Sequence, residues 1–143
     1  MRDNELIRRL SQLRDMRREV DELSQRIAKI EIAQQGRVTA PGHNRGRAGL
    51  EDARARMDAR RMDCMVELGR LYAFIDGIPE SRLRRIFSFR YIDGMTWLQI
   101  AFKIGECDEQ YPRKVHDRWL RKMAKKGVGL EKEAPDPAQR SAG

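Results

Sequence analysis

The sequence predicts an all-helical protein, with an antiparallel helical hairpin at the N-terminal end and a three-helix helix-turn-helix domain at the C-terminal end. Two segments repeat apolar residues every seven positions, the period of a helix with one narrow apolar seam. A stretch rich in glycine separates these segments. Residues 90–121 then carry short helix signals separated by glycines and end in a basic run.

The first repeat predicts a helix over residues 6–33. One row of apolar residues contains Leu6, Leu13, Val20 and Ile27, and a second row, three positions later, contains Met16, Leu23 and Ile30. Arg9 occupies the place where the second row would begin. The other positions are mostly charged or polar, as on a helix that is wet on most of its surface.

Residues 34–49 contain four glycines and one proline, so they predict a flexible basic loop. A second helix is predicted over residues 50–77, because the apolar period of seven resumes there. Its seam and the positions that widen the seam are Leu50, Met57, Cys64, Met65, Leu68, Leu71, Tyr72, Ile75 and Ile78. Two helices joined by a flexible loop predict an antiparallel hairpin over residues 1–78.

Two helices cover only one side of each apolar stripe. A homodimer or higher oligomer, formed through the hairpin, is therefore the expected state, with four helices in the simplest arrangement. The alternative is that the hairpin packs on the C-terminal domain of its own chain.

Residues 79–126 carry the signals of three short helices. Pro79 suits the start of a helix, and Gly94 is predicted to end it. Thr96 and Gln99 have the spacing of a capping box for the second helix, which Gly105 ends. The predicted buried face of these two helices contains Leu83, Ile86, Phe87, Tyr91, Ile92, Ile100, Ala101 and Ile104.

The third helix of this domain needs an N-cap near Asp108, although Pro112 lacks an amide hydrogen and shifts its possible start towards Gln110 or Tyr111. Val115 and Trp119 lie four residues apart and are predicted to point inward. Residues 127–143 have no apolar period, so they predict a disordered tail.

The chain has 30 Lys and Arg against 22 Asp and Glu, a net charge of +8, which favours nucleic acid, an anionic membrane face or an acidic protein as partner. Residues 111–126 hold seven basic residues and one acidic residue. A basic helix that follows a capped helix and a glycine turn predicts a helix-turn-helix that reads double-stranded DNA in the major groove through residues 109–126.

The hydrogen-bonding capacity of each side chain divides the predicted DNA contacts into two groups. The residues expected to contact base edges are Gln110, Arg113, Lys114 and Asp117. The residues expected to contact phosphates are Arg90, Thr96, Lys103, His116, Arg118, Arg121, Lys122, Lys125 and Lys126.

Other function classes find little support in the sequence. No segment has the roughly 20 apolar residues of a membrane span, and no secretory signal opens the chain, so a cytoplasmic location is expected. Cys64 and Cys107 lack the paired spacing of a metal or redox site. Neither His43 nor His116 has a nucleophile or a carboxylate pair placed beside it by the sequence. We therefore expect no catalytic residue, metal or cofactor.

Residues 86–105, followed by the segment RKVH and a basic helix, resemble the C-terminal domain of small phage-encoded regulators of the ArpU type. That domain is in turn similar to the fourth region of bacterial sigma factors. The residues that carry the resemblance are Arg90, Tyr91, Gly94, Thr96, Trp97, Ile100, Ala101, Gly105, Arg113, Lys114 and His116. The resemblance implies a transcription regulator of phage or prophage origin in a bacterial host cell. Pro112 departs from the family pattern, which tends to place an aliphatic residue there.

Two alternatives come from other functional classes. Small terminase subunits, which recognise DNA for packaging, also combine a helix-turn-helix with an oligomerising hairpin, but usually place the DNA-binding unit first. A sigma-like domain could instead bind RNA polymerase. The sequence specifies neither the target site nor whether the effect is activation or repression.

Overall fold

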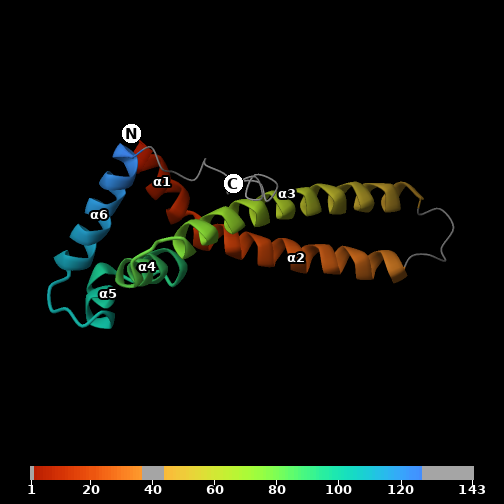
Figure 1. Cartoon of the computed structure of the whole chain (residues 1–143). Coiled ribbons are helices and arrows are strands. Elements are labelled where there is room, and N and C mark those ends of the chain that lie inside the picture. Colours follow the sequence, from red (N-terminus) through yellow and green to blue (C-terminus); the bar gives the residue numbers. More distant parts are fainter. Residues whose placement is uncertain (1, 37–43, 127–143) are drawn as a thin grey trace, which may run out of the picture. The chain divides into compact units, whose positions relative to one another are not determined.

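The computed structural model describes residues 2–36 and 44–126, and this part of the chain contains helices and turns but no strand (Figure 1). The predicted all-α class is confirmed. The elements are α1 (Arg2–Ser11), α2 (Leu13–Gly36), α3 (Asn44–Asp76), α4 (Ser81–Phe87), the π-helix η1 (Ser88–Ile92), α5 (Trp97–Lys103) and α6 (Gln110–Lys125). The predicted tail at 127–143 and residues 37–43 of the predicted loop lie outside the described residues.

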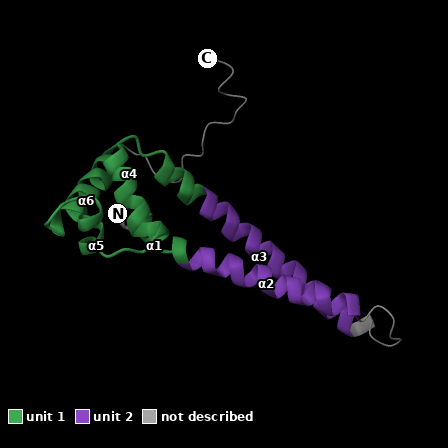
Figure 2. Ribbon diagram, turned by 90° about the horizontal axis from the view of Figure 1, so that it is seen from below, with its two compact units in different colours: residues 1–14, 70–143 green, residues 15–69 purple. Residues whose placement is uncertain are grey.

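The chain forms two compact units, coloured separately in Figure 2. Unit 1 contains residues 1–14 and 70–143, and unit 2 contains residues 15–69. The boundaries fall within α2 and α3, whereas the sequence analysis placed a single boundary between residues 78 and 79. The difference arises because both outer ends of the predicted hairpin carry buried residues of unit 1, namely Leu6, Leu10, Leu13, Leu71, Ile75 and Ile78.

The predicted continuous helix over residues 6–33 is interrupted at Gln12. There the amide of Gln12 donates to the carbonyl of Arg9 at 3.1 Å, a tighter turn than that of an α-helix. The Ser11 hydroxyl donates to the Ile7 carbonyl at 2.7 Å, a local bond that often bends helices. Leu10, absent from both heptad rows, is completely buried. The first row thus correctly contained the buried Leu6 and Leu13, but neither row contained Leu10.

Helix α3 begins at Asn44, six residues before the predicted start at Leu50. Residues 34–36 likewise belong to α2, so the predicted loop over 34–49 is helical at both ends. Glycine weakens a helix by about 1 kcal/mol but does not forbid it. Gly46 and Gly49 are exposed, and Arg47 pairs with Glu51 one turn later at 3.5 Å, which supports the first turns of α3.

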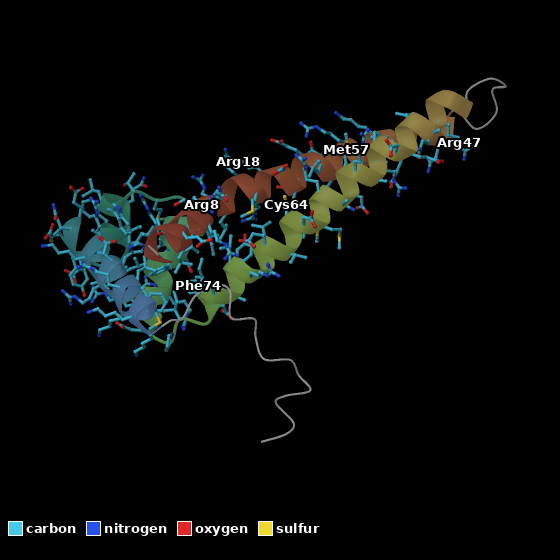
Figure 3. The ribbon with its side chains drawn as sticks, turned by 90° about the horizontal axis from the view of Figure 1, so that it is seen from above. Arg8, Arg18, Arg47, Met57, Cys64 and Phe74 are labelled. Carbon is cyan, nitrogen blue, oxygen red and sulfur yellow. The ribbon has the colours of Figure 1, made fainter. Side chains whose placement is uncertain are left out.

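Within unit 2, α2 and α3 run antiparallel, as polar contacts between them show. Arg54 of α3 pairs with Glu31 at 2.8 Å, and ten residues further along α3 the Cys64 thiol lies 3.7 Å from the Glu19 carboxylate. The partner in α2 thus moves back as the chain advances along α3. Figure 3 labels Cys64 on this stretch of α3 and Arg47 near its start.

The apolar seam of unit 2 is narrower than predicted. Among its described residues, Leu23, Ile27 and Leu68 are the buried apolar side chains. Met65, predicted to widen the seam, is 48% exposed and lies with Met62 and Val66 on the outer side of α3. These three residues, spaced by three and four positions, form an exposed apolar patch, which we call the α3 patch.

The core of unit 1 contains aromatic and aliphatic side chains from α4, η1, α5 and α6. Leu83, Ile86 and Phe87 of α4 are each no more than 1% exposed, and Ile100 and Ala101 of α5 are completely buried. Helix α4 runs directly into η1, where the amide of Asp93 donates to the carbonyl of Ser88, five residues back. Gly94 then ends the segment with a φ of 71°, as predicted. Ile92, predicted to be buried, is half-buried.

Replacement of Gly94 by alanine tests this turn. A left-handed backbone costs a residue with a Cβ about 1–2 kcal/mol, so Gly94→Ala should lower the free energy of unfolding in urea by that amount. The new Cβ would also overlap the Arg14 guanidinium, which must move away. Gly105 has a φ of 81°, and no atom lies within 4 Å of the position of an added Cβ. Gly105→Ala should therefore lower the free energy of unfolding by the same amount or less.

Gly69→Ala is the matched control, because Gly69 lies inside α3 with open space around it. It should raise stability by about 0.5–1 kcal/mol through helix propensity. Equal stability of Gly94→Ala and the unaltered protein would contradict the left-handed turn.

Candidate nucleic-acid interface

The turn between α5 and α6 is set by local backbone signals. The Gln99 amide donates to the Thr96 hydroxyl at 3.2 Å, and the Thr96 amide donates to the Gln99 side chain at 2.9 Å. This is the predicted capping box, and it fixes the start of α5. Gly105, in the left-handed region, ends α5, and the Asp108 carboxylate accepts from the Gln110 amide at the start of α6. Helix α6 therefore begins at Gln110, within the predicted range.

The buried face of α6 centres on Pro112, His116 and Leu120, each at most 2% exposed. The predicted anchors flank this line. Val115 is half-buried, and the half-buried indole of Trp119 packs edge-on against Phe87 with ring centroids 5.2 Å apart. Pro112 occupies the first turn of α6, where its missing amide hydrogen costs no helical bond, so it serves as a core residue.

The opposite face of α6 is exposed and basic. Eight of the predicted DNA-contacting residues lie there with exposed side chains, and these are Gln110, Arg113, Lys114, Arg118, Arg121, Lys122, Lys125 and Lys126. We call this set the basic face. It carries seven positive charges, which makes it suited to a polyanion.

His116 is the clearest correction to the predicted site. It was expected to contact phosphate, but its side chain is 2% exposed and lies in the core of unit 1. The imidazole stacks on Phe87 at 4.7 Å and meets the edge of Trp97 at 5.0 Å. A ring enclosed in this way does not lie on the exposed face of α6, where the DNA phosphate contacts were predicted.

The polar atoms of His116 are paired on both sides. The Asp117 carboxylate can only accept, so Nδ1–H of His116 donates to it at 2.9 Å. In the neutral ring Nε2 is then an acceptor, and the Tyr91 hydroxyl donates to it at 2.6 Å. Burial raises the pKa of Tyr91 to about 12 and lowers the pKa of His116 below 6.5, although the bond to Asp117 opposes the second shift. Both groups are therefore neutral near pH 7.

Three other predicted contacts are partly committed to the fold. The half-buried Asp117 is held by His116, so it is not a free acceptor for a base edge. Arg90 is half-buried, donates to the Met95 carbonyl at 3.1 Å and lies over the Trp97 ring at 4.5 Å. The Thr96 hydroxyl caps α5 but remains exposed, and Lys103 is exposed at the end of the same helix.

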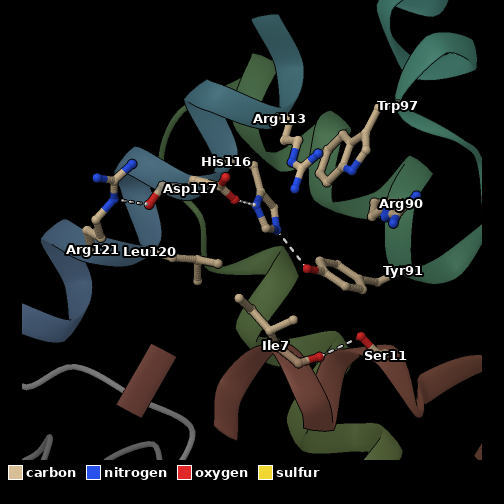
Figure 4. A pocket seen from close by; sticks show the side chains of 10 residues that line it. All are labelled: Ile7, Ser11, Arg90, Tyr91, Trp97, Arg113, His116, Asp117, Leu120 and Arg121. Atoms are coloured by element: carbon tan, nitrogen blue, oxygen red, sulfur yellow. Dashed lines mark hydrogen bonds and ion pairs between the residues drawn. The ribbon is translucent and has the colours of Figure 1, made fainter. Parts of the chain in front are cut away.

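A cavity of about 470 Å³ lies beside α6 in unit 1 (Figure 4). Ile7 and Ser11 of α1 form one side, and residues of η1, α5 and α6 form the rest. Arg90, Arg113 and Arg121 all line it, and Figure 4 shows the Arg113 side chain directed into it from α6. This cavity could not be predicted from the sequence, because residues 6–11 were assigned to the hairpin.

The Tyr91–His116 pair was also missed. One sequence signal could have revealed it, since His116 lies four residues after Pro112 and four before Leu120, on one helical line with both. The predicted inward pair, Val115 and Trp119, lies next to that line. The basic composition around His116 favoured the surface interpretation.

The described residues contain no metal-binding group of side chains and no disulfide. No three His, Cys, Asp or Glu side chains there are grouped to hold a metal ion, and Cys64 and Cys107 are both free thiols. No described helix is long and apolar enough to cross a membrane. Comparisons with protein-family models, curated proteins and solved structures find no match for the chain.

The buried His116 predicts a pH dependence of stability. Its pKa is lower in the folded protein than in the unfolded chain, so acid favours the unfolded chain, which binds the proton more readily. The contribution of His116 is therefore complete above pH 6.5 and is lost as the pH falls from 6.5 through the folded pKa. Urea unfolding at pH 7.5 and pH 5 should show this loss.

His116→Gln is the comparison variant, because it removes the titrating group while keeping polar atoms. Its stability should fall less between the two pH values than that of the unaltered protein. The same slope in both proteins would show that His116 is not buried in a neutral form.

Proposed function

We propose that the protein is a sequence-specific DNA-binding transcription regulator that inserts α6 into the major groove. The observation that carries the proposal is the basic face of α6, presented after a capped helix and a glycine turn. The buried line through Pro112, His116 and Leu120 directs the opposite face of α6 outward. An exposed, rigidly held basic helix is what major-groove recognition requires.

The basic face supports a division between base and phosphate contacts. Gln110 and Lys114 lie at the start of α6, where helix-turn-helix proteins place their base contacts, and both are exposed. Arg118, Lys122 and Lys125 follow on later turns and are suited to phosphates. Asp117 is no longer offered as a base contact, since His116 holds its carboxylate.

The resemblance to ArpU-type regulators adds an origin to this proposal. Three of the motif residues have the local roles that such a motif demands: Gly94 and Gly105 adopt left-handed conformations, and Thr96 caps α5. These roles support the motif as a structural unit. A regulator encoded by a phage or prophage and acting in a bacterial cytoplasm is the proposal that follows.

Oligomerisation through unit 2 is part of the same proposal. The α3 patch exposes Met62, Met65 and Val66 to about half of their surface. Three large apolar side chains on one helical face suit a contact with the same face of a second copy. A dimer would present two copies of the basic face to a two-fold DNA site.

A second candidate function is binding to RNA polymerase. Leu98 and Phe102 lie one turn apart on the outer face of α5 and are 45% and 69% exposed. Large apolar side chains in that position favour a protein partner rather than DNA. Co-purification with RNA polymerase in the absence of DNA, lost on Phe102→Ser, would favour this candidate.

DNA binding is tested by selecting bound duplexes from random sequences and then titrating salt. With about five to eight phosphates neutralised, log affinity should fall against log salt with a slope near −0.9 per contact. Gln110→Ala should cost about 1–3 kcal/mol and relax the selected sequence at one position, because glutamine pairs with adenine through two hydrogen bonds.

Lys125→Ala is the matched variant on the same helix. It should weaken binding to all sequences alike and reduce the salt slope by about one contact. No sequence preference after selection, or a salt-independent affinity, would reject the proposed function.

Sedimentation velocity tests the oligomer. The unaltered protein should sediment as a dimer at micromolar concentration, and the double variant Met62→Lys/Val66→Lys should sediment as a monomer, because two charges cannot be buried at the contact. Gln25→Lys, which adds a charge on the exposed side of α2, should leave the dimer intact. A monomeric unaltered protein would contradict the proposal, and a closed ring would favour the DNA-packaging alternative.

A further inference from the structure

Several arginines of unit 1 outside α6 hold the fold together. Arg82 pairs with Glu106 at 2.7 Å and also donates to the Ile104 carbonyl. Arg84 donates to the Ile78 carbonyl at 2.9 Å. In each case the guanidinium bridges one segment to another and has its acceptor within the protein.

The arginines around the cavity beside α6 are different. Arg113 makes no hydrogen bond or ion pair with any described residue. Arg121 uses its Nε alone, in a 3.4 Å contact to the Asp117 carbonyl of its own helix. Arg90 donates from one terminal nitrogen to the Met95 carbonyl. Each guanidinium carries five N–H donors, so all three keep donors without an acceptor among the described residues.

The charge of the cavity is also unbalanced. Asp117 is the one carboxylate among the described residues that line the cavity, and its Oδ1 accepts a hydrogen bond from Nδ1–H of His116. His116 itself is neutral near pH 7 because burial lowers its pKa. Among the described lining residues, three guanidinium groups and one carboxylate therefore surround a space of about 470 Å³. Such a cavity attracts an anion that offers several acceptor oxygens.

Arg90 is held in place beside the cavity. Arg90 and Tyr91 belong to η1, and single π-helical turns occur frequently at functional sites. Stacking over Trp97 at 4.5 Å fixes the Arg90 guanidinium at the edge of the cavity. The donor set is thus partly preorganised, which lowers the entropic cost of binding.

We propose that the cavity formed by α1, η1, α5 and α6 is a phosphate-binding site, with Arg90, Arg113 and Arg121 as its donors. Arginine forks match phosphate oxygens in pairs, and three of them suit a group with several acceptors and more than one negative charge. The volume exceeds that of a phosphate ion, so the phosphate group of a small ester fits.

The phosphate group can come from two sources, a free phosphate ester or the DNA backbone. Arg113 and Arg121 belong to both the cavity and the basic face, so a DNA phosphate can also reach them. The site goes beyond the proposed function, because a free ester would bind whether or not the protein binds DNA. If the site takes a DNA phosphate, free phosphate and DNA should compete for it. If the site takes a free ester, both should bind at the same time.

The first experiment measures the affinity of the protein for free phosphate in the absence of DNA. The full chain is titrated calorimetrically with inorganic phosphate and with glycerol 3-phosphate at constant ionic strength, with glycerol in chloride buffer as reference. Both phosphates should bind saturably. Arg113→Gln and Arg121→Gln should each weaken binding by about tenfold, the effect of losing a charge-assisted hydrogen bond.

Arg8→Gln is the matched control, because Arg8 lies on α1 with an exposed side chain outside the cavity. It should change the affinity for phosphate by less than about twofold, as expected for an exposed charge. Absence of saturable binding, or equal weakening by Arg8→Gln, would overturn the site. Circular dichroism of each variant checks that α6 is still folded.

The second experiment repeats the titration with duplex DNA bound. If free phosphate and DNA compete, and Arg113→Gln removes this competition, the cavity is supported as a site for a phosphate of the DNA backbone. Simultaneous binding would support it as a site for a free ester. If the protein binds no DNA, the proposed function fails while the first experiment still decides the phosphate site.

Discussion

The hydrogen bond from Tyr91 to His116 is the interaction on which the arrangement of unit 1 depends. It joins η1 to the middle of α6 at 2.6 Å, inside a shell formed by Phe87 and Trp97. Both polar atoms are buried, so removal of either partner would leave the other unpaired at a cost of about 1–3 kcal/mol. The orientation of α6 about its own axis is fixed by this bond.

That orientation determines what α6 can do. With Pro112, His116 and Leu120 inward, helical geometry places Gln110, Lys114 and Lys125 outward, whatever their charge. The flanking position of Arg113 is equally a consequence, since it lies between the outward face and the cavity. A rotation of α6 by one residue towards Arg113 would bury Arg113, Asp117 and Arg121. The fold therefore separates a neutral, paired interior from a cationic exterior along one helix.

Local signals in the sequence predicted the segment from α5 to α6 well. The capping box at Thr96, the left-handed glycines at 94 and 105, and the start of α6 depend on residues within a few positions of each other. The burial of Leu10 was not predicted, because it depends on contacts between α1 and residues far along the chain. No pattern of period seven contains that information.

The same distinction explains the misassigned site residues. Composition correctly identified α6 as basic, but could not say which of its polar residues lies beside a buried tyrosine 25 positions earlier. The π-helix η1 determines where this tyrosine, Tyr91, lies. Its wider turn, closed by the bond from the Asp93 amide to the Ser88 carbonyl, sets the positions of Arg90 and Tyr91 together. Tyr91 then reaches His116, while Arg90 stacks on Trp97 at the edge of the cavity. A single irregular turn thus links the anchoring of α6 to the charge placed beside it.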